Sequence, residues 1–471
     1  MNILTRRSLL KSAAGSGVLA ATTAALGACA LGGGDDNKKN DAAQGTKDAA
    51  NPLGVKEDAP LEIVIFNGGF GEDYAKAHEA MYAEKYPKAQ VKHSATQQIS
   101  TTLQPRFVDG SPPDVIDNSG AGQIDFNGLV SQGALADLAP LLDAPSLDDP
   151  SKKVRDTLLP GSLLPGTYDG KTMALNYTYT VYGIWYSQKL LDDKGWAYPK
   201  TWDEMIALCK TIKAAGISPW TYQGKHPRYM SWPILAAAAK MAGEDVLVAI
   251  DNLEPNAWKH PAILAAAEAY SQLAVDGYIM PGSEGLDHIQ SETEWCHGKA
   301  VFISCGSWLE SEMAKVTPQG FQMSVAPTPS LSTGDKLPFE ALRGTSGEPF
   351  IVPAKAKNLN GGLEYLRIML SKKGATDFIG KTSSLTCVTG VEAPNPTPGL
   401  ASVTKALKAS GDKGFNWVYN SYYRKLEREL VDAACGALFT KQINAKQWVE
   451  QCQKGADSIA QDSSIKKYKR S

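Results

Sequence analysis

The chain has 471 residues, of which 43% are hydrophobic and 21% charged, and its 48 basic and 50 acidic side chains give a formal net charge of −2. Such a balance excludes a strongly basic nucleic-acid-binding protein. The length and the hydrophobic content suffice for two folded domains, and after residue 29 no apolar run is long enough to span a membrane.

The first 28 residues are typical of an export signal. Arg6 and Arg7 form a twin-arginine motif, and residues 12–25 are apolar but too short a stretch to span a bilayer permanently. Cys29 follows a Leu-Gly-Ala triplet, which resembles the lipobox of bacterial lipoproteins, where the cysteine is acylated. We therefore expect cleavage before Cys29 and attachment to the extracytoplasmic face of the cell membrane through its lipid. An ordinary signal peptide with a chance cysteine is the alternative.

Both ends of the mature chain are expected to be loosely structured. Residues 29–57 contain a glycine triplet, paired acids, paired lysines and no aromatic residue, which predicts a flexible tether. At the other end, the basic stretch 466–470 is interpreted as a frayed terminus rather than an interaction patch.

Cysteine and histidine spacing gives no sign of a metal site. No CxxC pair occurs among the six later cysteines, Cys209, Cys296, Cys305, Cys387, Cys435 and Cys452. In an extracytoplasmic protein they either form one or more structural disulfides or stay reduced, and the sequence leaves both open. We expect no bound metal and no cofactor.

Short apolar strands alternate with helices at the start of the folded body. The pattern predicts strands at 61–67, 90–94 and 114–117, with helices at 74–86 and 99–108 between them. This βαβαβ order predicts a parallel sheet with right-handed crossovers, in which the loops after the strands are available to a ligand.

Two of these loops combine glycines with amide or hydroxyl groups. The first contains Asn67, Gly68 and Phe70, and the second contains Asn118 and Ser119. Glycine lets backbone N–H groups approach a bound molecule closely. Neither loop has the GxGxxG or GxxxxGK[ST] spacing, so nucleotide binding is excluded.

Seven short motifs then follow in a fixed order along the chain. They are Ser111-Pro112-Pro113-Asp114-Val115, Gly133 to Leu138, Asp169 to Leu175, Trp185-Tyr186-Ser187, Lys200 to Glu204, Gly298 to Phe302, and Gly306-Ser307-Trp308. Together they resemble the family of extracellular solute-binding proteins that includes maltose-binding protein. Phe66 to Tyr74 and Pro112 to Gly122 are most similar to actinobacterial binding proteins for N-acetylglucosamine and N,N′-diacetylchitobiose.

The resemblance implies a two-lobed α/β fold of the periplasmic-binding-protein type, each lobe a mostly parallel sheet flanked by helices. Lobe 1 would hold residues 58–178 and 329–385, and lobe 2 residues 179–328 and 386–471. The crossovers near 177–180 and 326–330 would act as hinges. The family's function implies a monomer that captures a sugar between the lobes and delivers it to the permease of an ABC importer.

A sugar site needs flat aromatic rings for the apolar face of the pyranose and polar groups for its hydroxyls. Besides the two glycine-containing loops, the resemblance places the following ligand contacts on this chain: Tyr177 and Tyr179 facing the cleft, Arg228, Tyr229, Gly306, Trp308, Glu348, Trp417 and Tyr422. Other aromatic residues are expected to pack inside the fold, namely Tyr182, Trp185, Trp196, Trp202 and Trp232.

Two alternatives remain at this point. One is a binding protein for another oligosaccharide, although the first loop lacks the strong acidity of the maltose type and so favours an acetamido sugar. The other is an exported glycoside hydrolase, which needs two carboxylates flanking the scissile bond. No acidic pair stands out from surface charge, and Glu292 and Glu294 are expected on the exposed side of their segment. No GxSxG or HExxH motif occurs, and we expect no enzyme activity.

Overall fold

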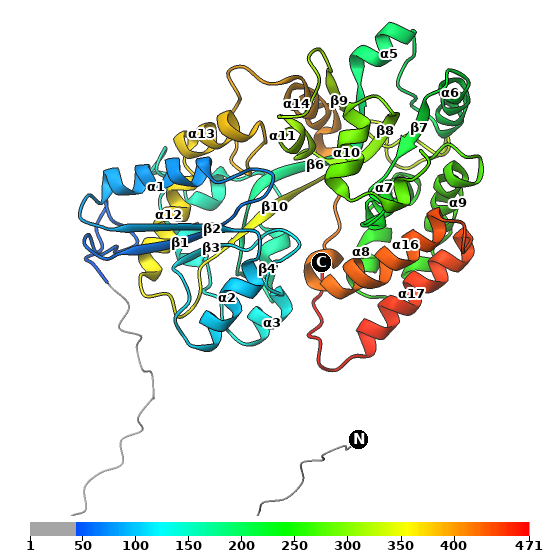
Figure 1. The fold of residues 1–471 in the computed structure, drawn as a ribbon. Helices are drawn as coiled ribbons and strands as arrows, with labels where there is room; N and C mark the ends of the chain where they lie inside the picture. Colours follow the sequence, from blue (N-terminus) through cyan, green and yellow to red (C-terminus); the bar gives the residue numbers. More distant parts are fainter. Residues whose placement is uncertain (1–43, 471) are drawn as a thin grey trace, which may run out of the picture. The chain divides into compact units, whose positions relative to one another are not determined.

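A mixed eight-stranded sheet runs through the folded body in a computed structural model of the chain, which describes residues 44–470. The export signal, Cys29 and most of the predicted tether lie outside these residues. The strand order is β2-β1-β3-β10-β6-β8-β7, and β9 pairs with β6 on the edge opposite to β8, following β10 along that edge (Figure 1). The strands are β1 Leu61–Phe66, β2 Val91–Thr96, β3 Val115–Asp117, β6 Leu175–Ser187, β7 Ser218–Thr221, β8 Ala300–Gly306, β9 Met323–Ala326 and β10 Arg343–Ile351; β4 Thr167–Tyr168 and β5 Lys171–Thr172 form a separate hairpin.

Helices cover the sheet and supply the cores with apolar side chains. The α-helices are α1 Asp73–Lys85, α2 Ile99–Val108, α3 Phe126–Ser131, α4 Ala139–Asp143, α5 Gln188–Lys194, α6 Trp202–Ala214, α7 Ser231–Ala242, α8 Asp245–Asp251, α9 Pro261–Val275, α10 His288–Cys296, α11 Leu309–Met313, α12 Leu359–Met369, α13 Lys372–Thr382, α14 Pro398–Ser410, α15 Tyr419–Tyr422, α16 Asp432–Phe439 and α17 Ala445–Gln461. A π-helix, η7 Leu426–Val431, joins α15 to α16. Among residues 44–470, no helix has both the length and the apolar composition needed to cross a membrane.

The predicted βαβαβ unit is confirmed. Strand β1 pairs in parallel with both β2 and β3, and α1 and α2 connect them. The run LEIVIF forms β1 because four of its six side chains are buried, so the sheet is apolar on both faces there.

Two apolar cores lie along this sheet. One is built from β1, β3, α1, α12 and α13. The other is built mainly from β6 to β9 with α6, α7, α9 and α17, and it continues under the opposite face of β1 and β3 to α2 and α3. The long antiparallel strands β6 and β10 connect the two cores: Leu175 and Phe350 belong to the first, whereas Val181 and Ile184 belong to the second.

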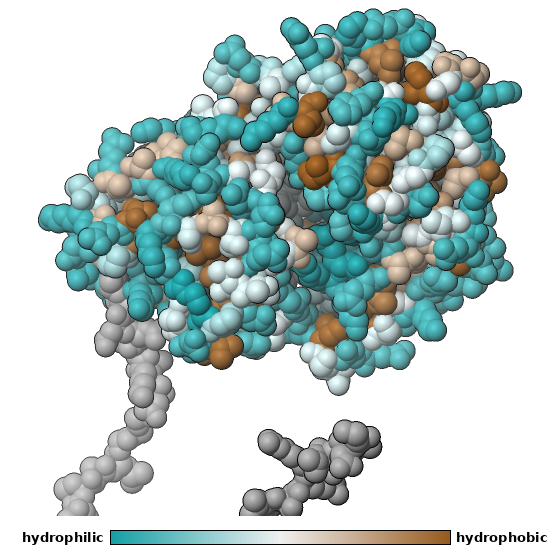
Figure 2. All heavy atoms as spheres, viewed as in Figure 1, coloured by the Kyte–Doolittle hydropathy of each residue, from teal (hydrophilic) through white to brown (hydrophobic). Residues whose placement is uncertain are grey.

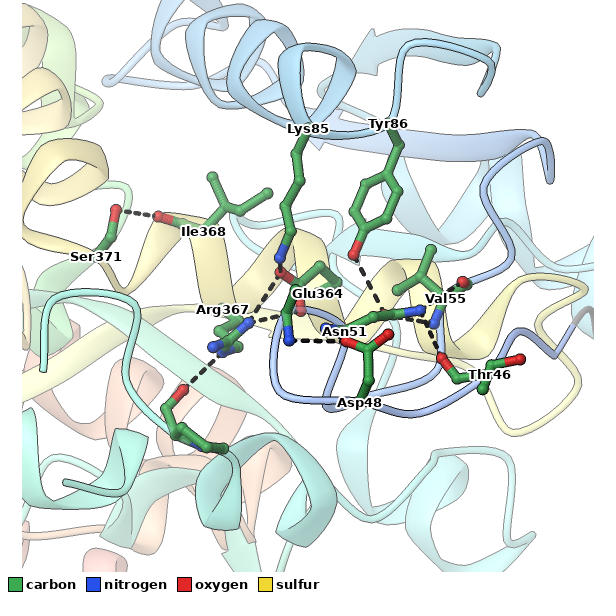
Figure 3. Close-up of polar contacts among 12 residues, drawn as sticks. Thr46, Asp48, Asn51, Val55, Lys85, Tyr86, Glu364, Arg367, Ile368 and Ser371 are labelled. Carbon is green, nitrogen blue, oxygen red and sulfur yellow. Dashed lines mark hydrogen bonds and ion pairs between the residues drawn. The ribbon is translucent and has the colours of Figure 1, made fainter. Parts of the chain in front are cut away.

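The end of the predicted tether differs from the expectation, because residues 53–55 are buried against the first core. Leu53 and Val55 are 4% and 1% exposed. The Asn51 amide donates to the carbonyls of Thr46 (3.0 Å) and Val55 (2.9 Å), and Tyr86 donates to Asn51 Oδ1 (3.4 Å), as Figure 3 shows. Leu53, Val55 and the Asn51 amide therefore attach this part of the segment to the folded body.

Two further expectations need correction, and the structure answers one question that the sequence left open. The basic stretch 466–470 is not frayed, since Tyr468 is only 3% exposed. All six cysteines between residues 209 and 452 are free and buried, so the possibility of structural disulfides is not realised in this structure. Glu292 is fully buried rather than exposed, and its Oε1 accepts a hydrogen bond from the Cys305 thiol (3.3 Å).

A candidate binding pocket

A pocket that is open to solvent lies over the strands that connect the two cores. Its floor consists of residues from β6 and β10: Asn176, Tyr182, Arg343, Thr345, Ser346, Gly347 and Pro349. Its N-terminal wall consists of Gln123, Phe126, Pro165, Tyr168 and Ala174, and its C-terminal wall of Trp417, Asn420, Ser421, Arg424, Glu427 and Arg428. In Figure 2 the surface is indented between the two ends of the sheet, and mainly hydrophilic residues border the indentation.

Strand alternation decides which side chains enter the pocket. Directly opposed residues of an antiparallel pair project to the same face, and β6 opposes β10 through Tyr182 with Arg343 and Asn176 with Pro349. Tyr177 consequently points to the other face, where it is fully buried and donates to the Met369 carbonyl (2.9 Å). The prediction that Tyr177 faces a cleft is therefore wrong, because the strand continues without interruption through the crossover.

Arg343 is the central polar residue of the floor. Its guanidinium lies between the rings of Tyr182 and Trp417, with 3.9 Å and 3.7 Å from the guanidinium carbon to the ring centroids. Nε donates to Asn416 Oδ1 (3.2 Å), and no carboxylate of residues 44–470 forms an ion pair with the guanidinium. Burial lowers the pKa of Arg343. The two terminal NH₂ groups are therefore available as donors to a bound molecule.

The C-terminal wall adds two more cationic side chains. Arg424 Nη2 donates to the Ala121 carbonyl, and its Nη1 is buried without a hydrogen-bond partner. Burial, and then the neighbouring Arg428, lowers the pKa of Arg424 to about 10. Arg428 pairs with Glu427 (3.3 Å) on the π-helix η7, a type of turn that is frequent at functional sites.

An aromatic cluster continues from the floor toward α11. Trp308 is half-buried and meets the Tyr182 ring edge-on at 5.5 Å, and Tyr229 lies 4.1 Å from Trp232 between ring centroids. A Cβ on Gly306 would lie 2.1 Å from the Trp308 ring, so only glycine fits there. Trp232, expected to pack inside the fold, is 8% exposed and lines a narrow crevice beside Tyr182. Trp308 and Tyr229 thus border the pocket without lining it.

The two glycine-containing loops use most of their polar groups within the fold. Asn118 is fully buried, with Oδ1 accepting from Ile124 N (2.8 Å) and Nδ2 donating to Ile124 O (3.0 Å). Ser119 donates to Asp117. In the first loop Asn67 is exposed, while Phe70 packs edge-on against Phe378 at 5.5 Å. Neither loop lines the pocket, although the carbonyl of Ala121 contacts Arg424.

Two pairs of buried carboxyl groups lie near these loops. Burial raises the pKa of Asp117 to about 6, and burial together with the charge of Asp117 raises the pKa of Glu348 well above its usual range. Burial and the charge of Glu312 likewise raise the pKa of Glu292. In each pair, burial together with the neighbouring carboxyl group thus favours the protonated form.

The remaining predicted contacts are placed as follows. Arg228 is 6% exposed and pairs with Asp432 (3.2 Å), Tyr422 packs against Tyr168 and Tyr468, Tyr179 lies beside Gly344, and Gly68 lies against the Phe66 ring. Of the predicted residues, the pocket is lined by Trp417. The sequence analysis missed Arg343, Asn420, Arg424 and Arg428, and it assigned Tyr182 to packing; the cross-strand pairing of β6 and β10 is the signal that identifies Tyr182 and Arg343. Among residues 44–470, no cluster of three or more His, Cys, Asp or Glu side chains is arranged to hold a metal ion.

Known proteins are similar to this chain in sequence and in fold. The family model described as bacterial extracellular solute-binding protein matches residues 67–376. The diacetylchitobiose binding protein NgcE of Streptomyces coelicolor is 35% identical over 473 residues, covering 99% of this chain and 98% of the relative. The multiple sugar-binding protein of Streptococcus mutans is 23% identical, covering 78% of this chain and 82% of the relative.

Two solved structures show the same fold. RafE from Streptococcus pneumoniae in its apo form superposes with a TM-score of 0.69 at 18% identity, covering 86% of this chain and 98% of the other. A chitin oligosaccharide binding protein superposes with a TM-score of 0.65 at 19% identity, covering 82% and 93%. The fold of this chain is therefore that of solute-binding proteins, as the sequence predicted.

Proposed function

Because this chain belongs to the family of bacterial extracellular solute-binding proteins, we propose that it captures N-acetylglucosamine or N,N′-diacetylchitobiose and delivers the sugar to the permease of an ABC importer. The observation that carries the proposal is the 35% identity, over 99% of this chain, to a diacetylchitobiose binding protein. The relative is matched over 98% of its own length, so the whole body is shared.

The chemistry of the pocket supports a carbohydrate. The rings of Tyr182 and Trp417 belong to the pocket lining, as aromatic rings do in pyranose sites, and Arg343 lies against one face of each ring. Arg343 and the amides of Asn176 and Asn420 supply donors and acceptors for hydroxyls and for an acetamido carbonyl. Trp308 and Tyr229 would extend the stacking surface at the border of the pocket.

We propose that the sugar is enclosed by closure of two lobes, residues 58–178 with 329–385 and residues 179–328 with 386–471. The first predicted crossover, 177–180, lies within β6 in the pocket floor, and the second, 326–330, begins at the end of β9; the proposal is that the chain bends at these two segments. Small-angle scattering should show a smaller radius of gyration at saturating sugar, and an unchanged profile would argue against closure.

The attachment to the membrane is also a proposal. Removal of residues 1–28 after twin-arginine export would leave a lipidated Cys29, which anchors a monomer outside the cell membrane. Cys29→Ala should abolish lipid labelling and release the protein from the cells. Lipid labelling of the variant would exclude the lipobox interpretation.

A glycoside hydrolase fits the pocket less well than a binding protein. Hydrolysis needs two carboxyl groups on either side of the scissile bond. The residues that line the pocket include a single acid, Glu427, and it is paired with Arg428. Another oligosaccharide remains the alternative ligand within the same function.

Calorimetric titration of the purified protein tests the proposal. N-acetylglucosamine and N,N′-diacetylchitobiose should bind, and neither should be hydrolysed during prolonged incubation. Glucose and maltose serve as the matched sugars without the acetamido group and should bind more weakly. Equal binding of maltose and diacetylchitobiose would overturn the assignment to acetamido sugars.

A further inference from the structure

Residues 465–470 contact the pocket from both sides, although their composition suggests a solvated end. Tyr468 is 3% exposed, and its backbone N–H and C=O both bond to the Tyr423 hydroxyl (2.9 and 3.1 Å). Arg470 is paired through its backbone with the Asn252 side chain, at 2.7 Å from Arg470 N and 3.0 Å to Arg470 O. The segment is therefore fixed by specific hydrogen bonds and not only by apolar contact.

The Arg470 side chain organises the backbone on both sides of Trp417. Its guanidinium donates to Asp251 Oδ2 (2.8 Å) and to the Asn416 carbonyl (2.8 Å), and it also pairs with Glu244. Asp251 Oδ1 in turn accepts from Val418 N and Tyr419 N, both at 2.8 Å. These are the peptide groups that flank the pocket tryptophan.

The same network reaches the pocket floor. Glu244 accepts from Asn416 N (3.0 Å), and the Asn416 side chain accepts from Arg343 Nε (3.2 Å) and donates to Thr345 Oγ1 (2.6 Å). Arg470 is thus two contacts away from the guanidinium that lies between Tyr182 and Trp417. Asp251 is fully buried, so the removal of Arg470 leaves an uncompensated charge at this point.

The segment also contacts the N-terminal wall. Tyr468 meets the Tyr168 ring edge-on at 5.0 Å, and Lys466 pairs with Asp169. The Asn127 amide donates to the Lys466 carbonyl (3.1 Å). One stretch of six residues therefore joins the wall that carries Tyr168 to the wall that carries Trp417.

We propose that residues 465–470 position the solute-binding residues: Arg470 fixes Trp417 and Arg343 in the orientation that stacks and hydrogen-bonds the solute, while Tyr468 and Lys466 fasten the two walls to each other. The inference rests on the proposed function for the identity of the solute. It assigns a binding role to residues outside the pocket lining. Arg470 is accordingly a positioning residue and does not touch the sugar.

The test compares Arg470→Ala and Arg470→Lys with Lys469→Ala in the full chain. Lys469 is exposed in the same segment, so its substitution removes the same charge and serves as the matched control. Lysine can pair with Asp251 but cannot contact Asp251, Glu244 and Asn416 together, since it lacks the planar fork of arginine. Diacetylchitobiose affinity per folded molecule is measured by titration calorimetry, and hydrogen exchange is followed in peptides that cover residues 416–419.

We expect Arg470→Ala to lower the affinity by about tenfold or more. The affinity of Arg470→Lys should lie between those of Arg470→Ala and the wild type, and Lys469→Ala should keep wild-type affinity. Exchange at the Val418 and Tyr419 amides should rise in the same order. Wild-type affinity in both Arg470 variants would overturn the proposal. So would a weakened Arg470 variant whose exchange at 416–419 is unchanged, because the loss of affinity would then not arise from a loss of order in these residues.

Two further arms keep the proposal testable. If Arg470→Ala does not fold, the double variant Asp251→Asn with Arg470→Met removes the buried charge together with its partner, and it should fold yet bind weakly; wild-type affinity there would exclude the positioning role. If the wild-type protein binds none of the sugars, the proposed function fails, while the exchange measurement still decides whether Arg470 orders residues 416–419.

Discussion

The pocket floor and its C-terminal wall differ from the two glycine-containing loops in how their hydrogen-bonding groups are used. Asn118 in the second loop is fully buried, and both the oxygen and the nitrogen of its amide form hydrogen bonds with the Ile124 backbone. Arg343 in the floor forms a hydrogen bond with the protein through Nε alone, and an aromatic ring lies on each face of its guanidinium. Both are buried polar residues, but only Arg343 has donors left for a ligand.

The difference shows that position in the topology does not by itself make a binding residue. Loops after parallel strands are the usual ligand sites of such sheets. A tight glycine-containing turn, however, must first satisfy its own backbone and side-chain groups, since an unpaired buried polar group costs free energy. The spare hydrogen-bonding capacity lies instead on the antiparallel strands β6 and β10 and on the chain around Trp417. The following predictions set these two regions against each other, beginning with the largest expected effect.

Trp417→Ala should weaken diacetylchitobiose binding most. Loss of a well-packed aromatic anchor costs about 2–4 kcal/mol, or roughly thirty- to a thousand-fold in affinity. Titration calorimetry on the folded variant measures the effect, and Trp196→Ala, a half-buried tryptophan outside the pocket lining, is the control. Unchanged affinity in Trp417→Ala together with a large loss in Trp308→Ala would move the stacking site to the aromatic cluster at the border.

Arg343→Met should lower the affinity by roughly tenfold to a hundredfold, because hydrogen bonds to a charged group contribute about 1.5–3 kcal/mol. Methionine keeps an apolar chain between Tyr182 and Trp417 and removes the donors. The affinity of Arg343→Lys should lie between those of the wild type and Arg343→Met, since a single ammonium group replaces the planar guanidinium. A loss of thermal stability without a loss of affinity would show that Arg343 serves the fold alone.

Sugars with a free amine should bind more weakly than neutral sugars of the same shape. Three arginines and one glutamate line the pocket, so a protonated amine meets net positive charge. A disaccharide of glucosamine should compete against diacetylchitobiose about tenfold less well than cellobiose, which has hydroxyls in place of the amines, and added salt should narrow the gap. Arg428→Gln should also reduce the difference in affinity between the amine disaccharide and cellobiose. Preferential binding of the amine sugar would contradict the charge assignment.

Asn118→Ala should lower stability and leave affinity within about twofold of wild type. The substitution leaves the N–H and C=O of Ile124 without their partners, which costs about 1–3 kcal/mol. Denaturant unfolding measures the stability, and exposed Asn67→Ala is the matched variant that should keep it. A selective loss of sugar affinity in either variant would show that its loop belongs to the binding site.

The smallest expected effect is a pH dependence of stability from the pair Asp117 and Glu348. Burial raises the pKa of Asp117 from 3.8 to about 6, so the protonated form stabilises the folded protein. That contribution is fully present below the unfolded pKa and is lost as the pH rises through 6. Asp117→Asn should therefore gain melting temperature relative to wild type between about pH 4 and pH 7. A constant difference across this range would show that the carboxyl pair does not titrate there.

Local sequence pattern was sufficient for the first part of the fold. Strand β1 and helices α1 and α2 follow from hydrophobic periodicity, and the parallel order follows from their alternation. The ordered motifs from Ser111 to Trp308 were sufficient for the family. These features depend on neighbouring residues in the chain or on motif order, so no knowledge of long-range contacts is needed.

The pocket itself was decided by tertiary structure. Tyr182, Arg343 and Trp417 are far apart in the chain and meet because β6 pairs with β10 in one register and Arg470 holds the segment after Asn416. A shift of one residue in that register would turn Tyr177 into the pocket and Tyr182 away from it. No local pattern specifies such a register or the partner of a buried charge, since both depend on which distant segments pack together.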